Sequence, residues 1–300
     1  MRFFKRHVFL SFIILLSSIF IYQNYTREVS YDKNTDKKNN HYVNELYKSD
    51  DRIYKNYLAE EDQMMYDLIY NMAKKYQLKK TINMKKFHCS DYVDCADFID
   101  TANSALYVDH PELMNYAGYR WVYANGRFNL TLQYSYYLPM KEAIGTLRIE
   151  KIIADIEEET KNMTDKEKIL YVYNWMGENN TYDRVFTYFS KNQSIYNVFV
   201  KKNAVCAGFA KASQLIFQKI GIESYVIQGN SDSEHMWNIV KYEDKYYYFD
   251  STIAVSIKNK KSDRYYNGLK QKEMDYYTVK FPEWYPKIES TNMFEIEKTA

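Results

Sequence analysis

The stretch that decides the fold is residues 203–254, which read NAVCAGFAKASQLIFQKIGIESYVIQGNSDSEHMWNIVKYEDKYYYFDSTIA. Apolar residues recur at helical spacing from Cys206 to Ile220, and Gly221 then supplies a helix stop. Three polar residues interrupt this pattern on the other side of the helix: Lys211, Gln214 and Gln218. The spacing therefore predicts a helix with one face in the core and one face in water.

Cys206 lies in the first turn of this predicted helix. The backbone N–H groups of a first helical turn have no partner within the helix, and with the helix dipole they stabilise a thiolate. The same N–H groups can hold the negative oxygen that forms when a carbonyl carbon is attacked. The position is therefore typical of a nucleophile, although a lone cysteine in a helix is more often a small apolar residue.

A predicted β-hairpin follows the helix and carries a histidine and an aspartate. One strand begins at His235, the next ends at Asp250, and Glu243-Asp244 forms the turn between them. If the turn has an even number of residues, Trp237 lies opposite Asp250. His235 then shares a sheet face with Asp250 and lies within side-chain reach of it. An odd turn would place the two side chains on opposite faces. The parity of the turn therefore predicts a His–Asp pair.

These residues together supply the parts of a nucleophilic catalyst. Cys206 offers a thiol, His235 a base, and Asp250 a carboxylate that fixes the tautomer and orientation of the base. Each residue alone is more often structural, but all three occur within 45 residues. Between the helix and the hairpin, the sequence predicts a short strand over Ser224–Gln228 and a loop over Gly229–Glu234.

The same residues lie in motifs that resemble the transglutaminase-like superfamily, which has a papain-like cysteine fold. The resemblance rests on Ala204–Ala210, His235–Val240 and Tyr248–Thr252. It is strongest toward exported bacterial members, whose upstream landmarks are similar to Asp109–Leu113 and Asn180–Asp183. The resemblance implies an α+β fold, in which a helix bearing the cysteine packs on an antiparallel sheet bearing the histidine and the aspartate.

The resemblance also implies roles for the site residues. Cys206 would be the nucleophile, His235 the general base and acid, and Asp250 the residue that orients the histidine. The chain departs from many relatives at Ala207, where a polar residue is frequent, and at Asn203, where glycine is common. The second donor to the oxyanion is therefore open, with two nearby polar candidates: Gln193 and Tyr196.

The amino terminus indicates export. Three basic residues precede an apolar run over residues 8–22: Arg2, Lys5 and Arg6. This order is typical of a secretory signal, but no small-residue cleavage site follows the run, which is also short for a full membrane span. Residues 1–22 are therefore predicted to be a signal peptide or a signal anchor. The polar, charge-mixed residues 23–50 are predicted to be a linker.

The remaining chain divides into an accessory α/β region at 51–150 and a transglutaminase-like domain at 151–300. A helix is predicted over 58–76, strands over 116–136 with an Asn125-Gly126 turn, and mostly helix over 149–181. A capping box starts the last helix, formed by two residues: Thr164 and Glu167. A local disulfide is favoured over a metal site for the remaining two thiols, Cys89 and Cys95.

The composition and the residue spacing limit the classes of ligand that we expect the protein to bind. The formal net charge of +2 gives no electrostatic case for binding nucleic acid, and the residue spacing implies no metal or other cofactor. We expect an extracytoplasmic cysteine enzyme, anchored through its N-terminal segment or secreted. Its expected substrate is a peptide or protein, including one associated with the cell envelope, whose carboxamide bonds it acts on. The alternative is a catalytically inactive module of the same fold that binds or scaffolds at the cell surface.

Overall fold

The computed structural model describes most of the chain beyond residue 52. The described residues are 53–84, 87, 92–124, 127–134, 139–184, 192–256 and 276–289. The predicted signal segment 1–22, the linker 23–50, Cys89 and the Asn125-Gly126 turn lie outside them. Residues Leu46–Ala300 form one compact unit. Among the helices of the described residues, none has both the length and the apolar character that crossing a membrane requires.

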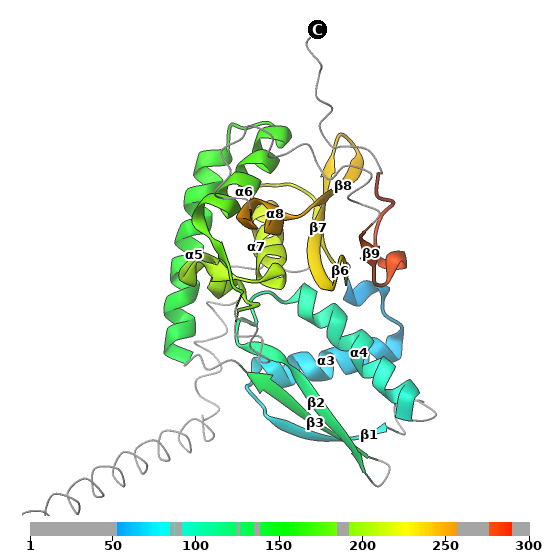
Figure 1. Ribbon diagram of the computed structural model, residues 1–300. Helices are drawn as coiled ribbons and strands as arrows, with labels where there is room; N and C mark the ends of the chain where they lie inside the picture. The colour runs from blue at the N-terminus through cyan, green and yellow to red at the C-terminus, as the bar shows by residue number, and fades with distance from the viewer. Residues whose placement is uncertain are drawn as a thin grey trace, which may run out of the picture. The chain divides into compact units, whose positions relative to one another are not determined.

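The C-terminal half is built on an antiparallel sheet of four strands in the order β8-β7-β6-β9, shown in Figure 1. The strands are β6 (Ser224–Asn230), β7 (Glu234–Tyr242), β8 (Lys245–Phe249) and β9 (Thr278–Val279). Helix α7 (Cys206–Lys219) packs against β6 and β7. The predicted α+β architecture, with the cysteine helix on an antiparallel sheet, is confirmed.

The predicted loop after Gln228 is partly wrong. Strand β6 continues through Gly229 and Asn230, which pair with β7 on one side and with β9 on the other. The pairing with β9 joins segments far apart in the sequence, so local turn signals at Gly229 and Asn230 did not reveal it.

Three more helices cover the sheet and the cysteine helix in this half. They are α5 (Pro139–Thr160), α6 (Asp165–Asn179) and α8 (Ser251–Ser256). The predicted capping box is confirmed, since Thr164 Oγ1 accepts from the Glu167 N–H and the Glu167 carboxylate accepts from the Thr164 N–H. A short parallel pair, β4 (Thr181–Tyr182) and β5 (Asn203–Ala204), together with the π-helical turn η3 (Asn197–Lys201), leads into α7.

The prediction that α7 has a face in water is wrong. Lys211 and Gln214 are buried, with exposed fractions of 5% and 3%. Gln214 exchanges two hydrogen bonds with Ser224, which satisfies its amide inside the protein. Lys211 lies with its Nζ 3.8 Å from the ring centre of Tyr107, which belongs to the N-terminal half. The polar face of α7 is therefore covered by another part of the chain rather than by solvent.

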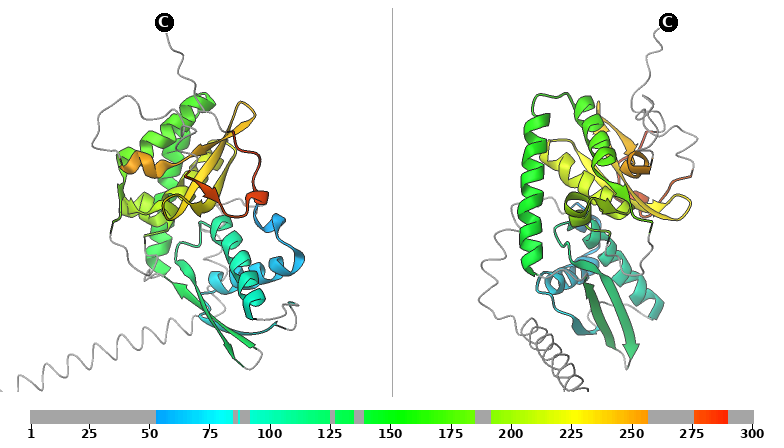
Figure 2. Two further views of the ribbon diagram at one scale, coloured as in Figure 1. Left: turned by 45° about the vertical axis from the view of Figure 1, so that its right-hand side comes forward. Right: turned by 60° about the vertical axis from the view of Figure 1, so that its left-hand side comes forward.

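The N-terminal half is an α/β region whose last element ends at Tyr134, whereas α5 crosses the predicted boundary at residue 150 and packs on α7. Figure 2 shows its helices beside its own three-stranded sheet, whose order is β1-β3-β2. The elements are η1 (Lys55–Tyr57), α3 (Glu60–Lys74), β1 (Lys79–Asn83), α4 (Tyr92–Asp109), β2 (Tyr116–Ala124) and β3 (Arg127–Tyr134). The helix predicted over 58–76 and the strands predicted within 116–136 are confirmed.

The two halves share a hydrophobic core. Ala210 and Val226 of the C-terminal half are buried in the same cluster as the helices and strands of the N-terminal half. The Tyr54 hydroxyl donates to the Val226 carbonyl at 2.6 Å, and Gln228 Nε2 donates to the Ser104 carbonyl at 2.8 Å. The contacts bury polar atoms in satisfied pairs, so they hold the halves in a defined arrangement.

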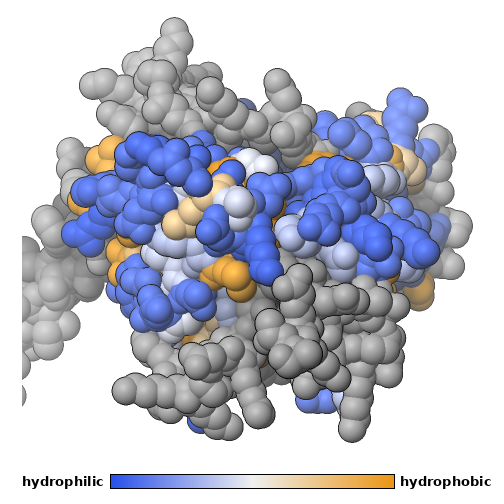
Figure 3. Space-filling model, turned by 90° about the horizontal axis from the view of Figure 1, so that it is seen from above, coloured by the Kyte–Doolittle hydropathy of each residue, from blue (hydrophilic) through white to orange (hydrophobic). Residues whose placement is uncertain are grey.

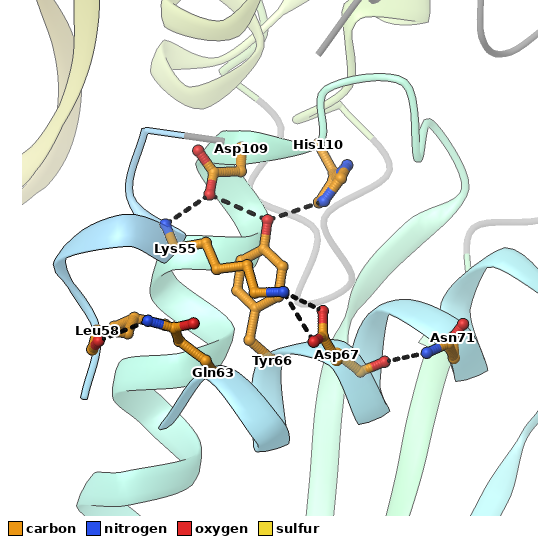
Figure 4. Close-up of polar contacts among 8 residues, drawn as sticks. All are labelled: Lys55, Leu58, Gln63, Tyr66, Asp67, Asn71, Asp109 and His110. Atoms are coloured by element: carbon orange, nitrogen blue, oxygen red, sulfur yellow. Dashed lines mark hydrogen bonds and ion pairs between the residues drawn. The ribbon is translucent and has the colours of Figure 1, made fainter. Parts of the chain in front are cut away.

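A buried polar cluster ties η1, α3 and the end of α4 together. Figure 4 shows the Tyr66 hydroxyl between two partners: it donates to Asp109 Oδ2 at 3.0 Å and lies 2.8 Å from His110 Nε2. Burial raises the pKa of Asp109 to about 6. The backbone N–H groups of Tyr54 and Lys55 donate to its carboxylate and oppose this rise. The Asp109–Leu113 landmark therefore contributes to the packing of the N-terminal half.

The face seen in Figure 3 is mostly hydrophilic, and its apolar spots are small and separated. Several of the large apolar side chains exposed elsewhere belong to the N-terminal half, among them Tyr92, Val122 and Tyr123. Small separated apolar spots are ordinary on a protein surface.

Candidate functional site

Cys206 begins helix α7, with Val205 as the capping residue. The carbonyl of Val205 accepts from the N–H groups of Gly208 and Phe209, which closes the first helical turn. Cys206 carries a free thiol that is partly exposed. The predicted position of a reactive cysteine at a helix start is thus the observed one, and the N-terminal end of the helix dipole favours negative charge there.

The β7–β8 hairpin brings His235 and Asp250 together. Its turn is formed by Glu243 and Asp244, both with positive φ (48° and 60°), as a tight hairpin turn requires. The register pairs Asn238 with Phe249, so the next pair along the two chains is Trp237 and Asp250. His235 Nε2 lies 2.7 Å from Asp250 Oδ2. The parity that the sequence predicts for the turn is confirmed.

The surroundings of His235 favour its charged form. Burial by itself would lower the pKa of His235, but hydrogen bonds to Asp250 and to Cys206 raise it to about 10. Because Nε2 faces the aspartate, Nδ1 is the ring nitrogen left for the thiol. An imidazolium held between a carboxylate and a thiol is the arrangement that thiolate chemistry uses.

Asp250 accepts hydrogen bonds on both carboxylate oxygens. Oδ1 accepts from the backbone N–H of Thr252 at 2.9 Å, and Oδ2 accepts from the Tyr277 hydroxyl at 2.8 Å in addition to His235. The side chain is 3% exposed. Tyr277 was not found by sequence reasoning, because only the tertiary pairing of β9 with β6 brings it to the site.

Aromatic rings enclose the His–Asp pair. The Trp237 ring stacks on His235 with centroids 5.7 Å apart and planes at 19°. Tyr277 meets both rings edge-on, at 6.0 Å from His235 and 4.8 Å from Trp237. Trp237 is almost fully buried, so it is both a wall of the site and part of the core. This apolar shell keeps bulk water from the pair, which strengthens its electrostatic interaction.

Tyr182 is a second residue whose place at the site the sequence did not reveal. The parallel pairing of Tyr182 with Ala204 sets it beside the start of α7. Burial raises the pKa of Tyr182, and the charge of the nearby Cys206 raises it further. The Asn180–Asp183 landmark was the signal that could have pointed to it.

The two residues named as candidate oxyanion donors lie in different places. Gln193 Oε1 accepts from the Tyr107 hydroxyl at 2.5 Å, and Tyr107 lies close enough for the charge of Cys206 to act on it. Tyr196 instead packs its ring onto Gly145 of α5, where an added Cβ would lie 2.5 Å from that ring. The structure thus leaves Gln193 at the border of the site and places Tyr196 against a neighbouring helix.

Lys211 is a buried cation behind the site. Burial lowers its pKa to about 7, and its Nζ lies over the Tyr107 ring. Within the described residues, no group of three or more histidine, cysteine, aspartate or glutamate side chains gathers in a way that would hold a metal ion. Cys95 is disulfide-bonded, and the other cysteine of the predicted pair, Cys89, lies outside the described residues.

Comparison with known protein families gives a match around this site. Residues 151–251 match the model of the transglutaminase-like superfamily, a segment that includes Cys206, His235 and Asp250. No curated protein matches the chain.

Two solved structures are similar to parts of the chain. A TGase crystal structure is 18% identical over 50% of this chain and 48% of its own, with a TM-score of 0.34. A structure of a candidate cysteine protease from Cytophaga hutchinsonii is 14% identical over 54% of this chain and 65% of its own, with a TM-score of 0.33. The chain thus spans less than two thirds of either structure.

Proposed function

We propose that this chain is a cysteine enzyme that acts on carboxamide bonds of peptides or proteins, and the match of residues 151–251 to the transglutaminase-like superfamily supports this. The observation that supports this best is the 2.7 Å bond between His235 and Asp250, with the Cys206 thiol near enough to raise the pKa of the imidazole. A nucleophile, a base and a residue that orients the base therefore occupy one site.

The first half-reaction forms an acyl-thioester. The proton of the Cys206 thiol is already held on His235 Nδ1 in the imidazolium, and the thiolate attacks the carboxamide carbon, whose π electrons move onto the oxygen. When the tetrahedral intermediate collapses, His235 returns the proton to the departing nitrogen, and the C–N bond breaks. Asp250 keeps the imidazole in the orientation that both transfers need.

The negative oxygen of the intermediate needs donors, and the start of α7 offers them. The backbone N–H of Cys206 points out of the first helical turn, and Tyr182 lies near Cys206, whose charge acts on the pKa of the Tyr182 hydroxyl. We assign Tyr182 as the second oxyanion donor, in the role for which the sequence had suggested Gln193 or Tyr196. A donor fixed beside the nucleophile stabilises charge that develops only in the transition state.

The second half-reaction determines the class of enzyme. Water attack on the thioester gives hydrolysis, as in a protease or amidase, whereas attack by an amine gives transamidation. In both cases His235 takes the proton of the attacking group and the Cys206 thiolate leaves. The substrate we propose is a peptide or protein that presents a carboxamide.

The test measures turnover of carboxamide peptides by the full chain, with and without an amine donor. We expect C206A to abolish turnover and H235A to lower it by roughly 10³-fold or more. D250N should lower it as well, whereas D244N, at the 97% exposed tip of the same hairpin, is the matched control and should not. Product analysis then separates release of ammonia or cleaved peptide from incorporation of the amine.

Alkylation of the thiol gives a readout that does not depend on knowing the substrate. Iodoacetamide should modify Cys206 in the folded protein, and H235A should slow that modification, since the imidazolium stabilises the thiolate. A Cys206 that stays inert in the folded chain, with no Cys206-dependent turnover, would instead support a binding or scaffolding module.

We also propose that the chain works outside the cytoplasm, held by its N-terminal segment or secreted. The basic and apolar order of residues 1–22 supports this location. The disulfide at Cys95 also supports it, because disulfides persist mainly in oxidising compartments.

A further inference from the structure

A hydrogen-bond donor to Asp250 comes from a segment beyond the residues that match the family. That match ends at residue 251, and Tyr277, which precedes β9, donates its hydroxyl to Asp250 Oδ2 at 2.8 Å across 27 residues of sequence. The ring of Tyr277 also contacts His235 and Trp237. Tyr277 therefore touches the carboxylate, the imidazole and the aromatic wall of the site at once.

Strand β9 reaches this position because Gly229 has no side chain. Gly229 pairs with Val279, and a Cβ added to Gly229 would lie 1.9 Å from the Thr278 carbonyl oxygen and 2.8 Å from Trp237 Cη2. Both distances are far shorter than atoms in contact can adopt. A larger residue at 229 would push β9 off the edge of the sheet and withdraw Tyr277 from Asp250.

We propose that Tyr277 is a positioning residue that holds the Asp250 carboxylate in the orientation in which it binds His235. This inference rests on the proposed function, which gives the His–Asp pair its task. The Thr252 N–H holds Oδ1 and Tyr277 holds Oδ2, so donors fix both ends of the carboxylate. Rotation of Asp250 would leave buried polar groups without partners, which is costly.

Tyr277 also affects the charge that His235 meets. Its hydroxyl and His235 Nε2 share one oxygen, so the phenol draws off part of the negative charge that would otherwise act on the imidazolium. The titratable groups that face His235 are Cys206 from α7, Asp250 after β8 and Tyr277 beside β9. Removal of the Tyr277 hydroxyl should therefore make His235 titrate at higher pH.

The experiment uses Y277F in the full chain, which removes the hydroxyl and keeps the ring. We expect kcat to fall roughly 10-fold with little change in KM, since the group acts on orientation rather than on substrate binding. The basic limb of the pH–rate profile should move to higher pH. The matched control is Y246F on β8, whose hydroxyl binds Glu223 away from the site, and it should leave kcat and the profile unchanged.

A second readout is the NMR titration of the His235 imidazole, which needs no activity. In Y277F the imidazole should titrate at higher pH than in the wild type. If kcat, the His235 titration and the basic limb of Y277F all match those of the wild type, Tyr277 is not a positioning residue. If wild-type turnover does not depend on Cys206, the proposed function fails, and the NMR titration still decides the role of Tyr277.

Discussion

At the scale of single residues, the Tyr182 hydroxyl is the group whose role is most open to direct test. It lies near Cys206, whose charge acts on the pKa of the hydroxyl. Of the two candidates that the sequence suggested, Tyr196 packs on α5, whereas Gln193 Oε1 accepts from the Tyr107 hydroxyl, a bond that orients the amide without using its NH2 group.

We expect Y182F to lower kcat by roughly 10²-fold and to change KM much less, because the lost hydrogen bond forms fully only in the transition state. Steady-state kinetics with a carboxamide peptide measure both constants. Y171F is the matched control, since the Tyr171 hydroxyl binds Glu159 on the outer helices. A Y182F enzyme with kcat within about twofold of the wild type would remove Tyr182 from the mechanism.

At the scale of elements, helix α7 does two tasks with different demands. Its first turn presents Cys206 to the site, and most of its remaining length is buried against β6, β7 and the helices α5, α6 and α8. This burial gives the thiol a fixed position but encloses Lys211, whose pKa burial lowers to about 7. The Tyr107 ring offsets part of the cost of that buried ammonium through a cation–π contact.

We expect K211M to raise the free energy of unfolding by roughly 2 kcal/mol or more at pH 6, and by less at pH 9. The pKa of Lys211 is about 7 in the folded protein and lies near 10.5 in the unfolded chain. The unfolded chain therefore binds more protons between these values, so the cost of burying Lys211 shrinks as pH rises. Methionine fills similar space without charge, so the gain in the free energy of unfolding from K211M also shrinks as pH rises.

Denaturant titrations at the two pH values measure this difference. K219M, the same substitution at the partly exposed end of α7, is the matched control and should change stability less at both pH values. An equal effect of K211M at pH 6 and pH 9 would contradict the pH dependence.

At the scale of the whole molecule, the N-terminal half completes the environment of the site. Tyr107 of α4 covers Lys211 and binds Gln193, and Tyr54 binds Val226 behind the sheet. The segment after β9 also packs on Tyr54. The ring centroids of Trp284 and Tyr285 lie 6.1 Å and 5.8 Å from that of Tyr54. The C-terminal half is therefore shaped by contacts that a family match over 151–251 does not include.

The proposed location outside the cytoplasm can be tested on the whole chain. Alkaline phosphatase fused after Ala300 should be active in a Gram-negative host, because that enzyme needs disulfides that form outside the cytoplasm. Removal of residues 1–22 should abolish the phosphatase activity. An inactive fusion of the complete chain that is present at normal levels would contradict an extracytoplasmic location.

The sequence by itself determined the local parts of the site. The helix start at Cys206 follows from helical spacing and the Gly221 stop, and the His235–Asp250 pair follows from the parity of a tight turn. Both are short-range properties, because a period of 3.6 or 2 residues sets which side chains share a face. The α+β architecture was predictable for the same reason, together with the family resemblance.

Only the tertiary structure decided what surrounds those parts. Tyr182 and Tyr277 reach the site through strand pairings between distant segments, and neither pairing has a local signal that specifies its partner. Lys211 has the spacing of a solvent-facing residue, but α4 covers it. Burial and long-range pairing depend on how the whole chain packs, so residue spacing within one element cannot determine them.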